Sequence, residues 1–269
     1  METTIVYMVA GMSSRFGGKI KQFARIGPNN ETLIEYSLNQ SLKAGFNKIV
    51  FIVANLTEKP FKDMFGDFYK GVPIKYALQK FNPEYRDKPW GTVDALCATK
   101  GIVTTPFVVC NGDDIYGEQV FKLLAEHLKK ESSGGTIGYE LGKVLSPAGG
   151  GVNRGIYELT PNNMVKTITE TFDITSNNLT EKNLTENSFC SMNIFALQPE
   201  TLEKLNKILE KFKQDRPGDK KAECLLPEEL SKLIRQEKLN LKLYPTTEKW
   251  FGVTNPEDEL MVKKELKKV

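Results

Sequence analysis

The sequence is poor in the residues that most often build metal sites and nucleophilic triads. It contains one histidine, His127, and four cysteines, at positions 97, 110, 190 and 224, none of them in a Cys-x-x-Cys pair. This excludes the usual zinc-binding spacings and weighs against a Ser-His-Asp triad. His127 falls in the helical pattern Val120–Leu128, so we expect it on the solvent side of a helix. The scattered cysteines fit a reducing compartment and predict a cytoplasmic protein.

Long apolar runs and a strong charge imbalance are also missing. No stretch approaches the roughly 18 apolar residues that a membrane span needs, so we expect no membrane partner. Residues Met1–Thr4 carry no basic group, which predicts no signal peptide. Lys and Arg total 37 against 34 Asp and Glu, and a net charge of +3 is too small to predict nucleic-acid binding. Length (269 residues) and mean hydropathy (−0.36) are typical of a globular α/β chain.

Short apolar runs alternate with helical patterns in the first part of the chain. The predicted strands are 4–10, 48–54, 74–78 and 106–110, and the predicted helices are 32–42, 61–68, 92–100 and a further helix in the 120s. This order predicts a mostly parallel sheet covered by helices on both faces.

The alternation of strand and helix patterns ends after residue 132. We predict short strands at 136–141, 155–159 and 189–197, a polar surface loop at 175–187, and helices at 199–212, 227–237 and 260–266, the last with a solvated lysine face. The sequence shows no internal repeat and no linker, so we expect one domain, 1–269.

A glycine-rich turn follows the first predicted strand. The segment Gly11–Gly18 would expose backbone N–H groups, which suit phosphate oxygens. Within it, Arg15 adds a bidentate donor, and Lys21 follows as a point charge. A solvated turn is the alternative interpretation.

Two other phosphate-binding patterns fit this turn less well. A P-loop needs Ser or Thr after Gly-Lys, but Gly18-Lys19 is followed by Ile20. A dinucleotide fold needs an acidic residue ending the second strand, where Ala54-Asn55 stands instead. A triphosphate-gripping loop of a nucleotidyltransferase accommodates both basic residues.

Two adjacent carboxylates follow the fourth predicted strand. Asp113 and Asp114 come directly after Cys110-Asn111-Gly112, at the edge where open α/β sheets bind ligands. Carboxylates beside phosphate suit Mg²⁺, and side chains alternate along an extended chain, so we expect Asp113 to face the metal directly. The alternative is an aspartate-rich turn that caps the next helix.

The segment Lys88–Ala95 opens a predicted helix. Gly91 would let a flat ring approach the backbone, and Thr92 could cap the helix, which suits a nucleobase pocket. A plain loop-to-helix junction explains the same residues.

Three features of the second half suit sugar hydroxyls. They are the loop 148–155, Glu170 and Asn193, because Glu and Asn both read hydroxyl groups. Exposed strand residues or turns would explain each of them equally well.

Taken together and in this order, these motifs resemble those of the sugar-1-phosphate nucleotidyltransferases (nucleotide-sugar pyrophosphorylases). The resemblance covers Ile5 to about Leu260 and rests on the following motifs: Gly11-x-x-Ser14-Arg15, Lys21-Gln22, Trp90-Gly91-Thr92, Gly112-Asp113-Asp114 and Trp250-Phe251-Gly252-Val253-Thr254-Asn255-Pro256-Glu257-Asp258. It implies a Rossmann-like three-layer α/β/α sandwich with a mostly parallel, mixed central sheet. It also implies a nucleotide-binding half, 1–131, and a sugar-binding half, 132–269.

The resemblance also implies roles for individual residues. Arg15, Lys21 and Asp113 would be catalytic, and Asp113 would bind Mg²⁺, with Asp114 and Asp258 as further candidate ligands. The expected nucleotide-binding residues are Ala10, Gly11, Met12, Ser13, Gln79, Trp90, Gly91 and Thr92. The expected sugar-binding residues are Gly155, Glu170 and Asn193.

The chain departs from the family pattern at two places. Many relatives carry a second metal-binding Asp where Gly252 stands here, which leaves Thr254, Asn255 or Asp258 as replacements. The family often places Lys directly after the sugar-binding Glu, whereas Thr171 follows Glu170. Another base would then hold the sugar phosphate, with Lys249 and Lys166 as the candidates.

The implied reaction joins a nucleoside triphosphate, UTP first, to glucose or N-acetylglucosamine 1-phosphate, and releases pyrophosphate. Those two substrates are the expected partners, and a homo-oligomer is allowed. The alternatives are a thymidylyl- or cytidylyltransferase with another phosphorylated acceptor, a metal-dependent glycosyltransferase, and a non-catalytic nucleotide-binding module.

Overall fold

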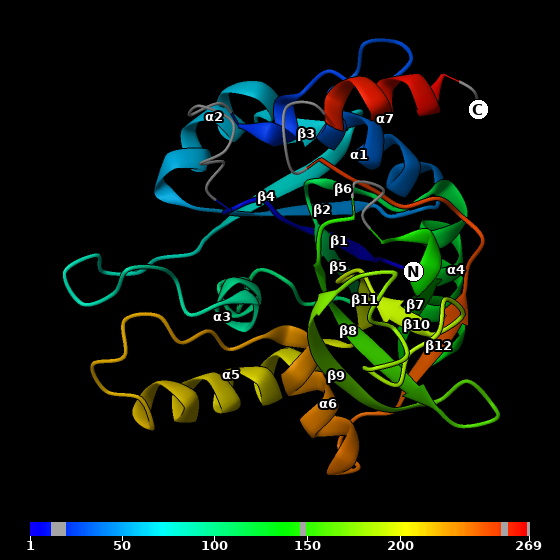
Figure 1. The fold of residues 1–269 in the computed structure, drawn as a ribbon. Coiled ribbons are helices and arrows are strands. Elements are labelled where there is room, and N and C mark those ends of the chain that lie inside the picture. The colour runs from blue at the N-terminus through cyan, green and yellow to red at the C-terminus, as the bar shows by residue number, and fades with distance from the viewer. Residues whose placement is uncertain (12–19, 146–148, 254–257, 268–269) are drawn as a thin grey trace.

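The computed structural model describes residues 1–11, 20–145, 149–253 and 258–267 (Figure 1). The helices are α1 (Leu33–Lys43), α2 (Asn55–Phe65), α3 (Thr92–Cys97), α4 (Glu118–Lys130), α5 (Pro199–Gln214), α6 (Leu226–Arg235) and α7 (Asp258–Leu266), with short 3₁₀ turns at Lys21–Phe23 and Leu141–Lys143. Among the described residues, none of these helices combines the length and apolar character that crossing a membrane requires.

Most of the strands belong to one mixed sheet. They are β1 (Thr4–Met8), β2 (Lys48–Val53), β3 (Phe68–Tyr69), β4 (Val72–Leu78), β5 (Phe107–Asn111), β7 (Gly134–Glu140), β8 (Val152–Leu159), β9 (Val165–Ile174), β10 (Phe189–Ser191), β11 (Phe195–Leu197) and β12 (Leu241–Pro245). Their order is β3-β4-β2-β1-β5-β11-β7-β10-β8-β9, and β12 pairs with β7. A separate ribbon joins β6 (Asp114–Ile115) to β13 (Phe251–Gly252).

Strand direction divides the sheet. The strands β4, β2, β1 and β5 are mutually parallel, so their carboxyl ends meet at one edge. From β5 onward the pairings along the sheet order are antiparallel, and β12 adds a parallel strand beside β7. The sheet is therefore mixed, with the parallel core that the sequence predicts.

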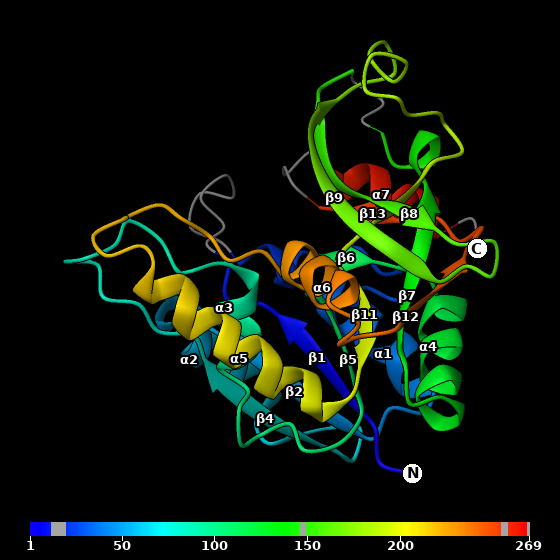
Figure 2. The same ribbon diagram turned by 90° about the horizontal axis from the view of Figure 1, so that it is seen from below.

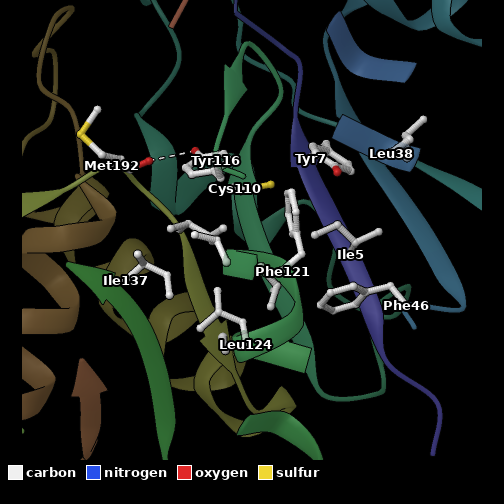
Figure 3. Close-up of a cluster of buried hydrophobic side chains, with 14 of the residues drawn as sticks. Ile5, Tyr7, Leu38, Phe46, Cys110, Tyr116, Phe121, Leu124, Ile137 and Met192 are labelled. Atoms are coloured by element: carbon white, nitrogen blue, oxygen red, sulfur yellow. Dashed lines mark hydrogen bonds between the residues drawn. The ribbon is translucent and has the colours of Figure 1, made fainter. Parts of the chain in front are cut away.

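Alternation along the strands places one core on each face of the sheet. Ile5 and Tyr7 of β1 join the core beneath α1, α2 and α4, which Figure 3 shows in part, whereas Val6 joins the core beneath α3, α5 and α6. The helices lie on both sides of the sheet when the molecule is turned (Figure 2). The three-layer α/β/α sandwich expected from the sequence is confirmed.

Two predicted elements have different bounds. The helix predicted at 61–68 begins earlier, as α2, and ends at Phe65. The hydroxyl of Thr57 accepts the backbone N–H of Ala54 at 2.9 Å and so secures a start upstream of Pro60. The strand predicted at 189–197 is two strands, because Asn193 between them has a φ of 57°.

The prediction for His127 is wrong. It lies on α4 as expected, but its side chain is buried and not on the solvent face. Its Nδ1 lies 2.9 Å from the Tyr244 hydroxyl and its Nε2 lies 2.8 Å from the Ser133 carbonyl oxygen. Both ring nitrogens have partners, so His127 can be buried at low cost, tying α4 to β7 and β12.

Candidate active site

A cleft of about 730 Å³ opens at the carboxyl edge of the parallel strands. Residues that follow β1, β2, β4 and β5 form one side of it, and the segment from Phe81 to Thr92 contributes the other side together with Glu223. The lining is mostly apolar, with Leu56, Phe81, Pro83 and Pro89 among the contacts. A planar apolar group with a polar rim matches this lining.

Most of the expected nucleotide-binding residues come together here. The cleft is lined by Ala10, Gly11, Gln79, Gly91 and Thr92, and Asp113 lies on its wall. Met12, Ser13 and Arg15 lie outside the described residues.

Trp90 is the exception among the expected residues, because it is not part of the cleft lining. The guanidinium of Arg86 lies 3.4 Å from its ring centroid, and the Phe212 ring packs edge-on at 6.1 Å. This packing joins the loop before α3 to helix α5.

Position 91 requires glycine because the backbone of Cys224 approaches it closely. Its φ is 94°, and a Cβ there would lie 2.7 Å from the carbonyl oxygen of Cys224. The Cys224 N–H donates to the Trp90 carbonyl oxygen at 2.7 Å, and Val93 N–H donates to the Cys224 carbonyl oxygen at 3.1 Å. Only glycine combines this conformation with this contact.

The expectation that Thr92 caps the helix is wrong. Gly91 occupies the N-cap position of α3, and Thr92 is the first helical residue. The Thr92 hydroxyl instead accepts the backbone N–H of Leu226 at 2.8 Å, at the start of α6. The residue therefore stabilises the terminus of a different helix.

Lys21 and Asp113 form an ion pair at the mouth of the cleft. The ammonium group of Lys21 contacts Oδ2 of Asp113, and both side chains are about a quarter exposed. A second ion pair, Lys88–Glu223, lies on the cleft wall. Residues separated widely in sequence are thus placed side by side at this edge of the sheet.

A smaller cavity of about 320 Å³ lies on the other side of the two aspartates. Asp114 lines this cavity, whereas Asp113 lines the larger cleft, as expected from side-chain alternation. Asn111 lines both. The two spaces therefore adjoin at the end of β5.

All three expected sugar-binding residues line the smaller cavity: Gly155, Glu170 and Asn193. Gly155 pairs with Glu170 across β8 and β9, and with Ser191 of β10. A Cβ at position 155 would lie 3.3 Å from the carboxylate of Glu170, so glycine leaves that carboxylate room over the sheet.

Both carboxylates of the smaller cavity have raised pKa values. Burial, followed by the neighbouring Asp113, raises the pKa of Asp114 to about 7. Its Oδ2 accepts hydrogen bonds from Asn111 Nδ2 at 2.8 Å and from the Tyr116 hydroxyl at 3.2 Å. Burial, followed by Glu228, raises the pKa of Glu170. These groups suit hydrogen bonding to hydroxyls more than ion pairing.

Arg154 lies in the segment 148–155 that is expected from the sequence to contact sugar, but the sequence patterns assign it no role of its own. Of the described residues that line the cavity, it is the sole cation. Its guanidinium donates to the carbonyl oxygens of Asn153 and Val144 at 2.9 and 3.2 Å and lies 5.3 Å from the Trp250 ring. Its position directly before Gly155 is the signal that could have pointed to it.

The two lysines expected to serve the acceptor lie elsewhere. Lys166 pairs with Glu158 at 3.2 Å, and Lys249 pairs with Glu265 at 3.1 Å. Neither lines either cavity.

The donor set fits a magnesium ion shared with a ligand. No cluster of three or more His, Cys, Asp or Glu side chains able to hold a metal occurs in the part of the chain that the structure describes. Mg²⁺ often takes one or two carboxylates and completes its shell with phosphate and water, so Asp113 on the wall of the larger cleft suits it, whereas Asp114 faces the smaller cavity. Asp258 begins α7 and lines neither cavity, while Thr254 and Asn255 lie outside the described residues.

Position 252 has no room for the missing carboxylate. A Cβ on Gly252 would lie 2.5 Å from the Trp250 ring and 3.2 Å from Asp114 Oδ1. The carboxylate of Asp114 therefore occupies the neighbourhood that a side chain at 252 would otherwise enter.

The sequence profile of a family described as nucleotidyl transferase matches residues 19–268. No curated protein matches the sequence. Solved structures match the fold over nearly the whole chain. A Bacillus anthracis protein proposed to be a glucose-1-phosphate thymidylyltransferase, crystallised with a sucrose, has a TM-score of 0.70 and 13% identity, covering 99% of this chain and 96% of its own.

Two further structures are similar to the same extent. A UDP-glucose pyrophosphorylase in complex with UDP-glucose has a TM-score of 0.67 and 17% identity, covering 100% and 99% of the two chains. An inositol-1-phosphate CTP transferase from T. maritima has a TM-score of 0.66 and 15% identity, covering 99% and 96%. At these identities the likeness shows the fold.

Proposed function

The chain belongs to the nucleotidyl transferase family, and we propose that it joins a nucleoside triphosphate to a sugar 1-phosphate with release of pyrophosphate. UTP is the favoured nucleotide, and glucose or N-acetylglucosamine 1-phosphate the favoured acceptor. The four cysteines are free thiols, which supports a reducing location such as the cytoplasm.

The observation that carries the proposal is the junction of the two cavities. Consecutive aspartates face different spaces, and Asn111 lines both of them. One space is larger and mostly apolar, and the other is smaller and polar. A nucleotide in the first and a sugar phosphate in the second would bring their phosphates together beside Asp113.

The reaction is an in-line displacement at phosphorus. An oxygen of the acceptor phosphate forms a bond to the α-phosphorus, the bond from that phosphorus to the bridging oxygen breaks, and pyrophosphate leaves with that electron pair. No protein nucleophile is required, so the protein contributes positioning and charge neutralisation. Lys21 would contact the transferring phosphate, and Arg15 the β- and γ-phosphates.

Asp113 would hold Mg²⁺, with Asp114 as the second candidate ligand. When bound, the ion supplies positive charge to phosphate oxygens. Lys21 contacts Asp113 in the structure, and so lies where its ammonium could also contact phosphate.

Each cavity supplies its own recognition groups. Gln79 and the backbone at Gly91 would contact the base. Gly155, Glu170 and Asn193 would contact the sugar. Arg154 would neutralise charge on the acceptor, since it is the cation that lines this space among the described residues.

A matrix of nucleoside triphosphates against sugar and alcohol phosphates tests the proposal, with pyrophosphate release as the measurement. We expect release to require both substrates and Mg²⁺, with UTP or dTTP in the most active pairs. Nucleotide binding without release across the whole matrix would overturn the proposal and favour a binding module. Release of free nucleoside diphosphate from a nucleotide sugar would favour a glycosyltransferase.

A further inference from the structure

The side-chain amide of Gln79 is held in one orientation. Its Nε2 donates to Oδ2 of Asp94 at 2.9 Å and lies 3.3 Å from the carbonyl oxygen of Gly91. Gln79 and Asp94 are only 7% and 8% exposed. Both N–H groups of the amide therefore have acceptors within the protein.

Lys213 holds the carboxylate of Asp94, which accepts the hydrogen bond from the Gln79 amide. The Lys213 ammonium donates to Oδ1 of Asp94 at 2.7 Å, from helix α5 to helix α3. A carboxylate paired with an ammonium has no hydrogen to donate. Turning the Gln79 amide over would set its carbonyl oxygen against Asp94 Oδ2 and the Gly91 carbonyl, leaving buried acceptors without donors.

The atom that Gln79 keeps for a ligand is consequently Oε1. Gln79 lines the larger cleft, and no described residue donates a hydrogen bond to its Oε1. A base that binds beside Gln79 must therefore donate an N–H group to Oε1. Uracil and thymine do so at N3, and guanine does so at N1, whereas the ring nitrogens at the same place in cytosine and adenine are acceptors.

We infer that Asp94 and Lys213 are positioning residues that set base selection by locking Gln79 as a hydrogen-bond acceptor. The inference rests on the larger cleft being the nucleotide site of the proposed function. The substrate class that follows is a triphosphate whose base carries an imide or lactam N–H. An acceptor placed against an acceptor leaves two desolvated lone pairs facing each other, which disfavours binding of the mismatched base.

The test measures nucleotide binding by calorimetry, with Mg²⁺ and without any acceptor. We expect UTP and dTTP to bind the wild-type protein at least about tenfold more tightly than CTP, the effect of one mismatched buried hydrogen bond. In Asp94→Asn the carboxamide can both donate and accept, so Gln79 can turn over. The preference for UTP over CTP should then fall to within about threefold, mainly through tighter CTP binding.

Lys211→Gln is the matched control, because Lys211 lies on the same helix and, among the described residues, forms its ion pair with the exposed Asp215 at 3.0 Å. It should keep the wild-type preference. Should Asp94→Asn fail to fold, Asp94→Ser takes its place, because a serine hydroxyl can also donate or accept, and it should lower the same ratio. Equal affinity of the wild-type protein for UTP and CTP, or an unchanged ratio in a folded Asp94→Asn protein, would overturn the inference.

Failure of the proposed function gives a different result. Selective binding of UTP that depends on Asp94, combined with no pyrophosphate release in any substrate pair, would overturn the transferase proposal while supporting the inference about Gln79.

Discussion

The two cavities handle charge in opposite ways. In the larger cleft, opposite charges face each other as ion pairs, Lys21 with Asp113 and Lys88 with Glu223. In the smaller cavity, Asp114 and Glu170 stand without a basic group within 4.0 Å among the described residues, and burial raises the pKa of both. Charged groups in the larger cleft are therefore paired. In the smaller cavity burial disfavours the ionised carboxylates, and the guanidinium of Arg154 lines the same space.

This difference follows from what each space would receive. A triphosphate brings several negative charges, and exposed ion pairs can exchange partners for phosphate oxygens at low cost. The acceptor substrate brings sugar hydroxyl groups, which need fixed hydrogen-bond acceptors and donors, and one phosphate, for which Arg154 would supply positive charge. The comparison predicts that variants of the two cavities will affect different substrates.

The largest effect should come from the residue at the junction. Asp113→Asn should lower turnover by a factor on the order of 10³, because it removes the carboxylate proposed to hold Mg²⁺. Pyrophosphate release at saturating substrates is the measurement. Asp63→Asn, which removes an exposed carboxylate paired with Lys59, is the control and should leave turnover unchanged. Turnover of Asp113→Asn within tenfold of the wild-type value would show that the Asp113 carboxylate is not needed for the reaction.

Next in size is a stability effect on the wall of the larger cleft. Gly91→Ala should lower the free energy of unfolding by about 2–4 kcal/mol, since it combines a strained φ with a backbone collision. Gly101→Ala isolates the strain, because Gly101 has a φ of 79° and nothing within 4 Å of its Cβ position. Urea titration of both variants gives the comparison, and equal losses would show that the contact with Cys224 does not matter.

A smaller effect should separate the two substrates. Arg154→Gln should raise the KM for the sugar phosphate about tenfold and leave the KM for the nucleotide unchanged, as expected for loss of one charge-assisted contact. Lys166→Gln and Lys249→Gln serve as controls, because both lysines lie outside the cavity lining. A rise in the nucleotide KM alone would contradict the assignment of the smaller cavity to the acceptor.

The smallest effect should appear in the pH dependence of stability. The pKa of Glu170 is raised in the folded protein, so its ionised form opposes folding, and this cost grows as pH rises through that pKa. Glu170→Gln removes the cost. The variant should therefore melt a few degrees above the wild type at pH 8, with the gap closing toward pH 5, as thermal melting would measure. A gap that widens at low pH would show that Glu170 is stabilised as the anion.

The first half of the fold could be predicted from local patterns. The strands β1, β2 and β5 lie within a residue or two of the apolar runs at 4–10, 48–54 and 106–110. Buried parallel strands carry continuous apolar sequences, and right-handed crossovers leave few topologies. The strand-end residues of the larger cleft follow from the same rule.

The second half depends on contacts that leave no local pattern. A left-handed Asn193 splits one predicted strand into β10 and β11, and β12 was not predicted at all. The contacts that shape the cleft join distant residues: Thr92 to Leu226 across 134 positions, and Asp94 to Lys213 across 119. Periodicity reports on neighbouring residues, so it could place Gln79 at the end of a strand. The role of Gln79 came from the family resemblance, and neither approach identified the groups that hold it.

The peptide unit between Asp113 and Asp114 bears on how the substrates of the two cavities are aligned. It is a rigid plane, and the side chains on either side of it belong to different cavities. The Cα atoms of Asp113 and Asp114 therefore keep a fixed separation when this segment moves. The two carboxylates would then stay at a constant backbone spacing even when the surrounding loop moves. Alignment of the reacting phosphates would depend on this fixed spacing and not on a rigid loop.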